Sequence, residues 1–371
     1  MAEKVKVVFC TDGIFPHAVG GMQRHSKLLI EALSKSGEAE MVVIHPHPGI
    51  QVFEGFDNIQ EIALPPLPGK QNYLRELYAY SKLVAAEVKK LPDHIIYSQG
   101  LSIWADVKTL GKRTIVNPHG LEPFQAIGFK DRLKTLPFRI IFSKIFKNCS
   151  KVVSLGGRLS PILKNAGRAD NVVVLPNATN PIPAQEKKLI RPKGHPLHFL
   201  FVGRFAHNKG IGVLLEAAKQ LNDAGFEGDF KIDLAGKGPL FEEMKAAYPL
   251  PNVNFLGFVS DEQLDNAYLN DDVFVLPTLF EGMPTVILEA MARAMPIIVT
   301  DTGATLELVD QSNGHIIEKN DVQSLKSAMQ TYLEMPNLEF EEKSGASMEK
   351  FLARFTWEAV AKAHLKLFRD R

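Results

Sequence analysis

Short apolar runs alternate with amphipathic stretches along the whole chain. Between the runs of the first half, apolar residues recur at helical spacing, as in residues 22–37, where Gly37 follows the expected helix end. Alternation of this kind predicts α/β units, each with a parallel sheet and helices on both faces. The strand-like runs of the first half are residues 4–10, 40–46, 94–99, 113–119, 151–155 and 171–177.

The alternation stops at residues 180–196, which are rich in Pro and Lys and have no apolar period. It then starts again, which predicts two Rossmann-like domains, 1–182 and 195–355, joined by an exposed linker near residue 185. Since open parallel sheets bind ligands at the carboxyl ends of their strands, we expect the two sheets to face each other across a deep cleft. The runs of the second half are 197–204, 230–236, 253–258, 272–278, 296–301 and 315–319.

The composition mainly argues against certain classes of protein and of binding site. A chain of 371 residues with 45% hydrophobic and 23% charged residues is not generally disordered. Lys+Arg 43 against Asp+Glu 42 gives a net charge of +1, so nothing global indicates a nucleic-acid partner. Cys10 and Cys149 lie far apart and form no ligand motif, which argues against a zinc site or a disulfide framework. No signal-peptide core and no apolar run of about 18 residues is found, so we expect a cytoplasmic protein.

The loop after the first strand of the second half contains two cations. Arg204 and Lys209 lie between Gly203 and Gly210, just before an expected helix. Two cations beside free helix N–H groups fit a phosphate or diphosphate, and the alternative is a pair of solvated surface charges.

The next loop, LAGKGPL, has glycines at Gly236 and Gly238. They allow close backbone approach to a ligand, or only a tight turn from strand to helix. Their spacing is not the G-x-G-x-x-G of a dinucleotide fold.

Residues 280–290, FEGMPTVILEA, place two glutamates around a turn between a strand and a helix. Pro284 is expected as the first helical residue, which leaves the N–H groups of residues 285–287 as a second anion site. Glu289 has apolar neighbours, so its carboxylate needs donors such as a ribose diol, unless it is simply an acid favoured at a helix start. Glu281, in the turn, can contact a bound sugar or cap the helix.

Two further features lie in the first half. Gly20 and Gly21 come after the first strand and immediately before a helix, another backbone anion site. His119 ends another expected strand, although a lone histidine is more often structural than catalytic.

Together, the order and spacing of these loops resemble the retaining glycosyltransferases of the GT-B fold, family 4, over nearly the whole chain. The resemblance rests on the Gly20-Gly21 loop, the His119-Gly120 pair, GR…KG, AGKGPL, FLGFVSDEQL followed by DVFVLPT, and the two glutamates of residues 281–289. The stretch FTWEAVAKAHLKLF resembles the last helix of that family. Residues of about 356–371 are therefore expected to cross back and complete the N-terminal, acceptor-side domain, with donor binding on the C-terminal domain.

The resemblance implies roles for individual residues. Arg204 and Lys209 would clamp the donor diphosphate. Glu289 would hold the ribose hydroxyls, Glu281 would contact the sugar near the reacting carbon, and His119 would touch the sugar. The base would be held mainly by main chain near Phe258 and Val259. The remaining donor-binding positions would be Gly20, Gly21, Gly203, Gly236, Gly238, Gly282, Met283, Pro284, Thr285 and Val286.

The chain departs from the family pattern at two loop positions. Ala178 follows Pro176-Asn177 where the family commonly has glycine, and Ala294 stands near Pro296 where glycine is also common. Neither position contributes a reacting group.

Cations and N–H groups can stabilise the charge that develops on a leaving diphosphate, so we expect no metal and no other cofactor. The resemblance therefore implies a metal-independent, retaining hexosyltransferase that uses a UDP- or GDP-sugar. Its acceptor would be a glycan or a lipid-linked molecule in cell-surface polysaccharide or glycolipid synthesis. A catalytically idle sugar-nucleotide-binding protein stays open as an alternative, as does an NAD-dependent dehydrogenase, although the glycine fingerprint of the latter is missing.

Residues 129–153 interleave four phenylalanines with basic residues, among them Lys130, Arg132, Lys134, Arg139, Lys144 and Lys147. A basic amphipathic segment can lie on an anionic membrane, here the inner face of the plasma membrane. The alternative is an ordinary helix with its apolar face turned to the core.

Overall fold

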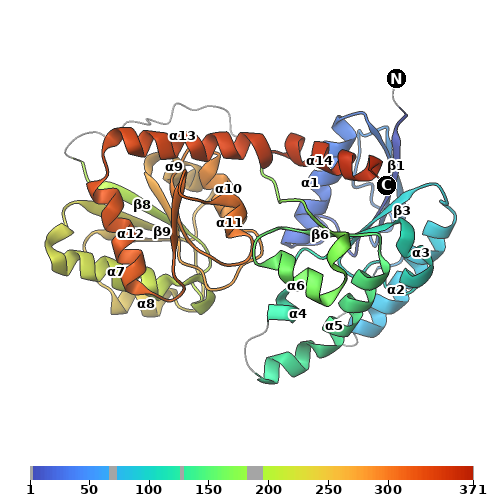
Figure 1. The fold of residues 1–371 in the computed structure, drawn as a ribbon, viewed down its shortest axis with the longest axis horizontal. Coiled ribbons are helices and arrows are strands. Elements are labelled where there is room, and N and C mark those ends of the chain that lie inside the picture. The colour runs from blue at the N-terminus through green and yellow to red at the C-terminus, as the bar shows by residue number, and fades with distance from the viewer. Residues whose placement is uncertain (1–2, 67–72, 126–128, 182–194, 371) are drawn as a thin grey trace. The chain divides into compact units, whose positions relative to one another are not determined.

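The computed structural model describes residues 3–66, 73–125, 129–181 and 195–370. The chain forms two compact units (Figure 1). One contains Met1–Asn177 together with Trp357–Arg371, and the other contains Ala178–Thr356. The predicted linker near residue 185 lies outside the described residues.

The first unit contains a seven-stranded parallel sheet in the order β3-β2-β1-β4-β5-β6-β7. The order reverses between β1 and β4, where Val7 has Met41 on one side and Ile95 on the other. Sequence periodicity did not predict β3, whose five residues are all partly or fully exposed at the sheet edge. The strands are β1 Val5–Cys10, β2 Ala39–His45, β3 Ile59–Ala63, β4 Ile95–Gln99, β5 Thr114–Asn117, β6 Lys151–Ser154 and β7 Val172–Val174.

Helices cover both faces of this sheet. Tyr80 and Val84 of α2 pack with Val8, Ile44 and Ile96 in a buried cluster on one face. The last helix, α14, packs against α1 and β1 (Figure 1), so its predicted return to the first unit is confirmed. The helices are α1 Gly21–Lys35, α2 Tyr73–Lys89, α3 Val107–Leu110, α4 Glu122–Gln125, α5 Phe129–Asn148, α6 Leu159–Ala166 and α14 Trp357–Arg369.

The second unit contains a six-stranded parallel sheet in the order β10-β9-β8-β11-β12-β13. Its order reverses between β8 and β11, which makes this the point where ligands bind in open α/β sheets. The apolar runs are buried because helices cover both faces; all four residues of β11 and of β12 are buried. The strands are β8 Leu197–Val202, β9 Phe230–Ala235, β10 Val253–Gly257, β11 Val273–Leu276, β12 Ile297–Thr300 and β13 Gly314–Ile317.

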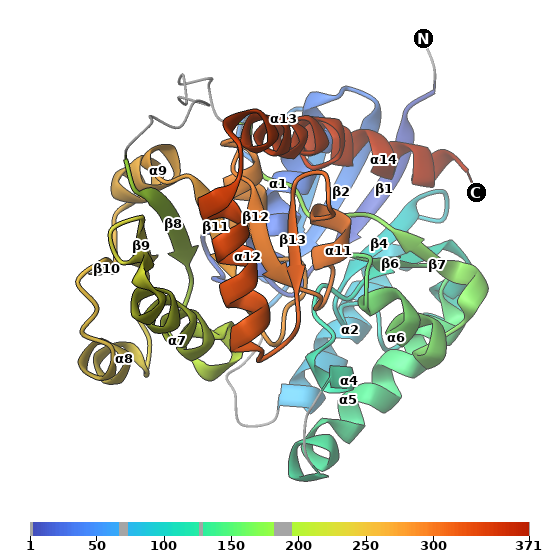
Figure 2. The ribbon, with the colours of Figure 1, turned by 60° about the vertical axis from the view of Figure 1, so that its left-hand side comes forward.

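In this unit α7 and α12 pack side by side (Figure 2). The sequence starts α9 with a capping box, in which Ser260 and Gln263 exchange hydrogen bonds with each other's backbone N–H. The helices are α7 Ile211–Leu221, α8 Phe241–Ala247, α9 Asp261–Asn270, α10 Thr285–Met291, α11 Thr305–Leu308, α12 Val322–Glu334 and α13 Asn337–Arg354.

The basic segment predicted at 129–153 forms α5 and then enters β6. Its first half exposes Leu133, Leu136 and Ile140, which are 53%, 44% and 61% exposed. Its second half buries Phe142 and Phe146, so the ordinary-helix alternative accounts for that half. Within the described ranges, no helix is both long and apolar enough to cross a membrane.

Candidate functional site

The predicted donor-side residues gather at one edge of the second sheet. Because its strands are parallel, the loops after β8, β9, β10, β11 and β12 all leave from the carboxyl edge. The loops after β8 and β11 are neighbours at the point where the strand order reverses. This adjacency brings together residues that are more than 70 positions apart in the sequence.

The closest polar contact between these two loops joins Lys209 and Glu281, whose Nζ and Oε1 atoms form an ion pair. The two side chains are 22% and 12% exposed. The Thr278 hydroxyl lies 2.8 Å from the Asn208 carbonyl oxygen and 3.2 Å from Glu281 Oε1. The Leu279 N–H also donates to the Asn208 carbonyl, at 2.8 Å. A network of main-chain and side-chain bonds therefore fixes the pair.

The predicted two-cation loop is divided in the structure. Lys209 ends a short helical turn, His207–Lys209, and is paired with Glu281. Arg204 is exposed and has no ion-pair or hydrogen-bond partner within the described part of the chain. Its guanidinium is therefore available to a ligand or to water.

Backbone crowding explains the two glycines of the loop after β9. A Cβ atom on Gly236 would lie 2.0 Å from the Gly203 carbonyl oxygen, and one on Gly238 would lie 2.4 Å from the Phe205 carbonyl oxygen. The Phe205 N–H donates to the Lys237 carbonyl at 3.1 Å. The tight-turn alternative thus accounts for these glycines without a ligand.

The turn after β11 begins α10 one residue later than predicted. Pro284 is extended and caps the helix, and Thr285 is the first helical residue, which corrects the expected position of Pro284. The Ile287 N–H donates to the Pro284 carbonyl at 3.2 Å, so it is not a free donor as predicted. The N–H groups of Thr285 and Val286 have no acceptor among the described residues. Met283 and Pro284 are buried, so contacts there would use main-chain groups.

The segment after β12 packs against the backbone of this turn at Glu281 and Gly282. A Cβ atom on Gly303 would lie 2.3 Å from the carbonyl oxygens of Glu281 and Gly282, and its φ of 54° suits glycine. The Ala304 N–H donates to the Gly282 carbonyl at 2.7 Å.

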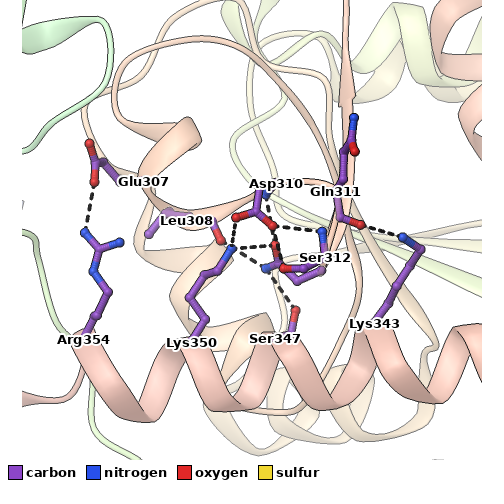
Figure 3. Close-up of polar contacts among 10 residues, drawn as sticks. Glu307, Leu308, Asp310, Gln311, Ser312, Lys343, Ser347, Lys350 and Arg354 are labelled. Atoms are coloured by element: carbon purple, nitrogen blue, oxygen red, sulfur yellow. Dashed lines mark hydrogen bonds and ion pairs between the residues drawn. The ribbon is translucent and has the colours of Figure 1, made fainter.

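Side chains on one face of α13 bind residues 307–313, which follow this segment in the chain (Figure 3). Lys350 Nζ lies 2.7 Å from Asp310 Oδ2 and 3.1 Å from Asn313 Oδ1. Burial raises the pKa of Asp310, but hydrogen bonds from Lys350 and Ser312 outweigh it and hold the pKa at about 2. Three further α13 contacts follow the same face, namely Lys343 with the Gln311 carbonyl, Ser347 with Asn313, and Arg354 with Glu307.

Glu289 has partners that the sequence analysis did not identify. Tyr268, from α9, donates its hydroxyl hydrogen to Glu289 Oε2 at 2.9 Å. The Arg293 guanidinium lies 4.6 Å from the centre of the Tyr268 ring and pairs with Asp265. The spacing of Glu289 and Arg293, one helical turn, was visible in the sequence, but Tyr268 lies on another element and left no such signal.

The predicted base-contact positions lie in the loop after β10. Phe258 is 83% exposed and Val259 is half-buried. They border a hollow of about 350 Å³ between the sheet edge and α9. The hollow is lined by Asp233, Leu256, Phe258, Val259, Gln263, Asn266, Ala267 and Asn270.

In the first unit, Gly20 and Gly21 begin α1 after the loop that follows β1. A Cβ atom on Gly20 would meet the flexible end of Gln23 at 2.2 Å. One on Gly21 would meet nothing within 4 Å. The chain's own packing therefore gives no reason for glycine at position 21.

His119 is half-buried at the carboxyl edge of the first sheet, with a positive φ of 58°. Its Nε2 contacts Gln99 Oε1, and its backbone N–H donates to Asn117 Oδ1 at 3.0 Å. Burial, with a smaller effect of His364, lowers the pKa of His119 to about 3. The imidazole is therefore neutral near pH 7, with one nitrogen that can donate a hydrogen bond and one that can accept.

A buried chain of hydrogen bonds joins this histidine to α14. His364 Nδ1 donates to the Val360 carbonyl at 2.8 Å, so its Nε2 accepts from the Tyr97 hydroxyl at 2.9 Å. Asn117 Nδ2 in turn donates to the Tyr97 oxygen at 3.3 Å. Burial lowers the pKa of His364 to about 4.

No three His, Cys, Asp or Glu side chains within the described ranges gather closely enough to hold a metal ion. Cys10 and Cys149 are both buried and unpaired with each other.

Comparison with known families matches both units. Residues 19–181 match the family described as Glycosyltransferase Family 4, and residues 183–350 match Glycosyl transferases group 1. An uncharacterized glycosyltransferase of Methanocaldococcus jannaschii is 25% identical over 95% of each chain. Relatives matched over shorter stretches are named as glycosyltransferases of colanic acid and amylovoran biosynthesis.

Solved structures share the fold over nearly the whole chain. Sucrose-phosphate synthase from Thermosynechococcus elongatus matches with a TM-score of 0.77, at 21% identity over 99% of each chain. HepE from Anabaena in complex with UDP-glucose matches with a TM-score of 0.66, at 16% identity over 99% of this chain and 100% of that one.

Proposed function

Because the chain belongs to the family 4 glycosyltransferases with the GT-B fold, we propose that it moves a hexose from a UDP- or GDP-sugar to a glycan or lipid-linked acceptor, with retention of anomeric configuration. The relatives of polysaccharide biosynthesis support the class of acceptor. The UDP-glucose complex of HepE supports the class of donor.

One observation carries the proposal: Arg204, Lys209 and Glu281 come from adjacent loops at the reversal of strand order in the second sheet. A diphosphate entering this edge would meet the free guanidinium of Arg204 and the remaining N–H donors of Lys209. An ammonium group has three donors, so Lys209 can keep Glu281 and still bind phosphate. Glu281 is then held beside the phosphates, where the sugar is attached.

The proposed reaction exchanges one bond at the anomeric carbon. The bond to the donor phosphate oxygen breaks, and its electron pair stays on the leaving nucleoside diphosphate. The acceptor oxygen forms the new bond on the same face, and its proton passes to the leaving phosphate. Charge develops on the leaving group, so cations fixed before the reaction lower the barrier, and the step needs no metal. Glu281, being paired with Lys209, is assigned to positioning the sugar and not to nucleophilic attack.

Several assignments remain predictions within this proposal. Glu289 would bind the ribose, and Gly203, Gly236, Gly238, Phe258, Val259 and residues 282–286 would surround the donor. Gly20, Gly21 and His119 would contribute from the first unit. His119, being neutral, would act as a hydrogen-bond partner of the sugar.

We further propose peripheral contact with an anionic membrane on its cytoplasmic side. The first half of α5 supports this, because exposed Leu133 and Ile140 lie in the same exposed helical stretch as Lys130, Arg132 and Lys134. Binding to vesicles with and without anionic lipid tests it, and equal binding to both would argue against it.

Donor turnover tests the proposed reaction. Purified protein would be incubated with a panel of UDP- and GDP-sugars with and without EDTA, and the release of nucleoside diphosphate would be measured. We expect turnover with one base, lost in Glu281→Ala and Lys209→Ala and kept in Lys219→Ala, which removes an exposed lysine of α7. Turnover that EDTA abolishes would refute metal independence. Binding without any turnover, in the presence of acceptor glycans, would favour a catalytically idle protein.

A further inference from the structure

A buried tyrosine holds one oxygen of Glu289. Tyr268 is 1% exposed, and its hydroxyl lies 2.9 Å from Glu289 Oε2 and 3.3 Å from the Val286 carbonyl oxygen. A phenol hydroxyl has one hydrogen, and the shorter contact with the charged acceptor is the stronger. Burial, together with the Glu289 carboxylate, raises the pKa of Tyr268, so the hydroxyl remains a donor.

Arg293 fixes both members of this pair. Its guanidinium stacks on the Tyr268 ring, 4.6 Å from the ring centre. Its Nη1 group donates to the Glu289 carbonyl at 3.0 Å, and its Nη2 group pairs with Asp265. The Arg293 side chain is only 5% exposed, so it has little freedom to move away.

The second oxygen, Glu289 Oε1, has no hydrogen-bond partner within the described part of the chain. The side chain is half-buried, and Oε1 is not among the fully buried polar atoms that lack a partner, so it is open to water or to a ligand. One carboxylate oxygen has two lone pairs and can accept from two adjacent hydroxyl groups. The arrangement therefore offers a fixed acceptor for a diol.

We propose that Tyr268 and Arg293 are positioning residues that hold Glu289 toward a vicinal diol, and that they thereby make the protein select ribonucleotides over 2′-deoxyribonucleotides. This inference rests on the proposed function of the site. A mobile carboxylate could turn to water when a hydroxyl is missing. A carboxylate held at Oε2 cannot, so the missing hydroxyl leaves its acceptor unpaired and lowers affinity.

Calorimetric titration of UDP and 2′-deoxy-UDP, or of the guanosine pair if that base is preferred, measures the selection. We expect wild type to bind the ribonucleotide at least about tenfold more tightly, as the loss of one hydrogen bond to a charged group implies. Tyr268→Phe should weaken UDP binding, leave deoxy-UDP binding nearly unchanged, and reduce the ratio to about threefold or less.

Tyr332→Phe is the matched control. Tyr332 is fully buried in α12 of the same unit, and its hydroxyl has no hydrogen-bond partner in the described structure. Its removal should leave the ratio at the wild-type value. Arg293→Lys provides a second variant, since lysine keeps a charge for Asp265 but loses the planar stacking, and it should also reduce the ratio.

The outcomes separate the inference from the proposed function. If wild type binds no nucleotide, the proposed function fails. If wild type binds UDP but not in preference to deoxy-UDP, the diol contact is wrong and the inference is overturned. It is also overturned if Tyr268→Phe weakens both ligands by the same factor, because Tyr268 would then be only a packing residue.

Discussion

Replacement of His364 by glutamine should reduce the acid sensitivity of the first unit. His364 is 1% exposed, and burial lowers its pKa from 6.5 to about 4. Glutamine can still accept from the Tyr97 hydroxyl through its side-chain oxygen, but it does not titrate. The substitution therefore removes one proton-binding group while preserving the buried hydrogen bond.

The direction of the effect follows from proton binding. Between pH 6.5 and about 4 the unfolded chain protonates this histidine and the folded chain does not. The contribution of His364 to stability is thus complete above pH 6.5 and is lost as the pH falls toward 4. For these two pKa values, linkage gives a loss of about 1 kcal/mol in the free energy of unfolding between about pH 7 and about pH 5.5.

The assay can report on this unit alone. The chain has two tryptophans, Trp104 and Trp357, and both belong to the first unit. Urea unfolding followed by tryptophan fluorescence at the two pH values should show wild type losing about 1 kcal/mol more than His364→Gln. His17→Gln, which removes an exposed histidine of the same unit, should follow wild type. Equal losses in wild type and His364→Gln would refute the assigned burial and tautomer.

Three further predictions concern other positions. Gly21→Ala should leave the free energy of unfolding within about 0.5 kcal/mol of wild type, because a Cβ atom there would meet nothing within 4 Å. Since the proposed function places the donor against Gly21, the added methyl group should weaken donor binding about tenfold in titration; unchanged affinity would remove Gly21 from the proposed site. Ala294 has a φ of 55°, so Ala294→Gly should raise stability by about 0.5 kcal/mol and Ala294→Val should lower it by about 2 kcal/mol in thermal unfolding followed by circular dichroism; the opposite order would contradict the backbone assignment. Lys350→Met should lower the thermal stability of the second unit by about 0.5–1 kcal/mol, because Asp310 and Asn313 each lose one of their donors and the Asp310 side chain is largely exposed; no change would show that the α13 contacts are dispensable.

The sequence was most informative where burial is uniform. The strands of the second sheet are continuous apolar runs because helices cover both faces, and such runs were visible directly. The edge strand β3, whose five residues are all partly or fully exposed, carries no such run and was missed. Family resemblance, and not periodicity, predicted the return of the last helix.

The arrangement of the site was less accessible to sequence reasoning. The ion pair between Lys209 and Glu281 depends on β8 and β11 being neighbours, which follows from strand order and not from local pattern. Tyr268 contacts Glu289 from a helix that precedes β11, so no spacing rule connects them. Gly236 and Gly238 formed a motif that was visible in the sequence, but its cause was not. A glycine can be required by a bound ligand or by a neighbouring backbone segment, and the sequence does not tell which.

The central claim is that cations at the carboxyl edge of the second sheet bind the diphosphate of a nucleotide sugar. Calorimetric titration of UDP and UMP, or GDP and GMP, in EDTA tests this most directly. We predict that wild type binds the diphosphate at least about tenfold more tightly than the monophosphate, and that Arg204→Ala and Lys209→Ala each reduce this preference. Equal affinity of wild type for diphosphate and monophosphate, or a preference that survives both substitutions, would contradict the claim.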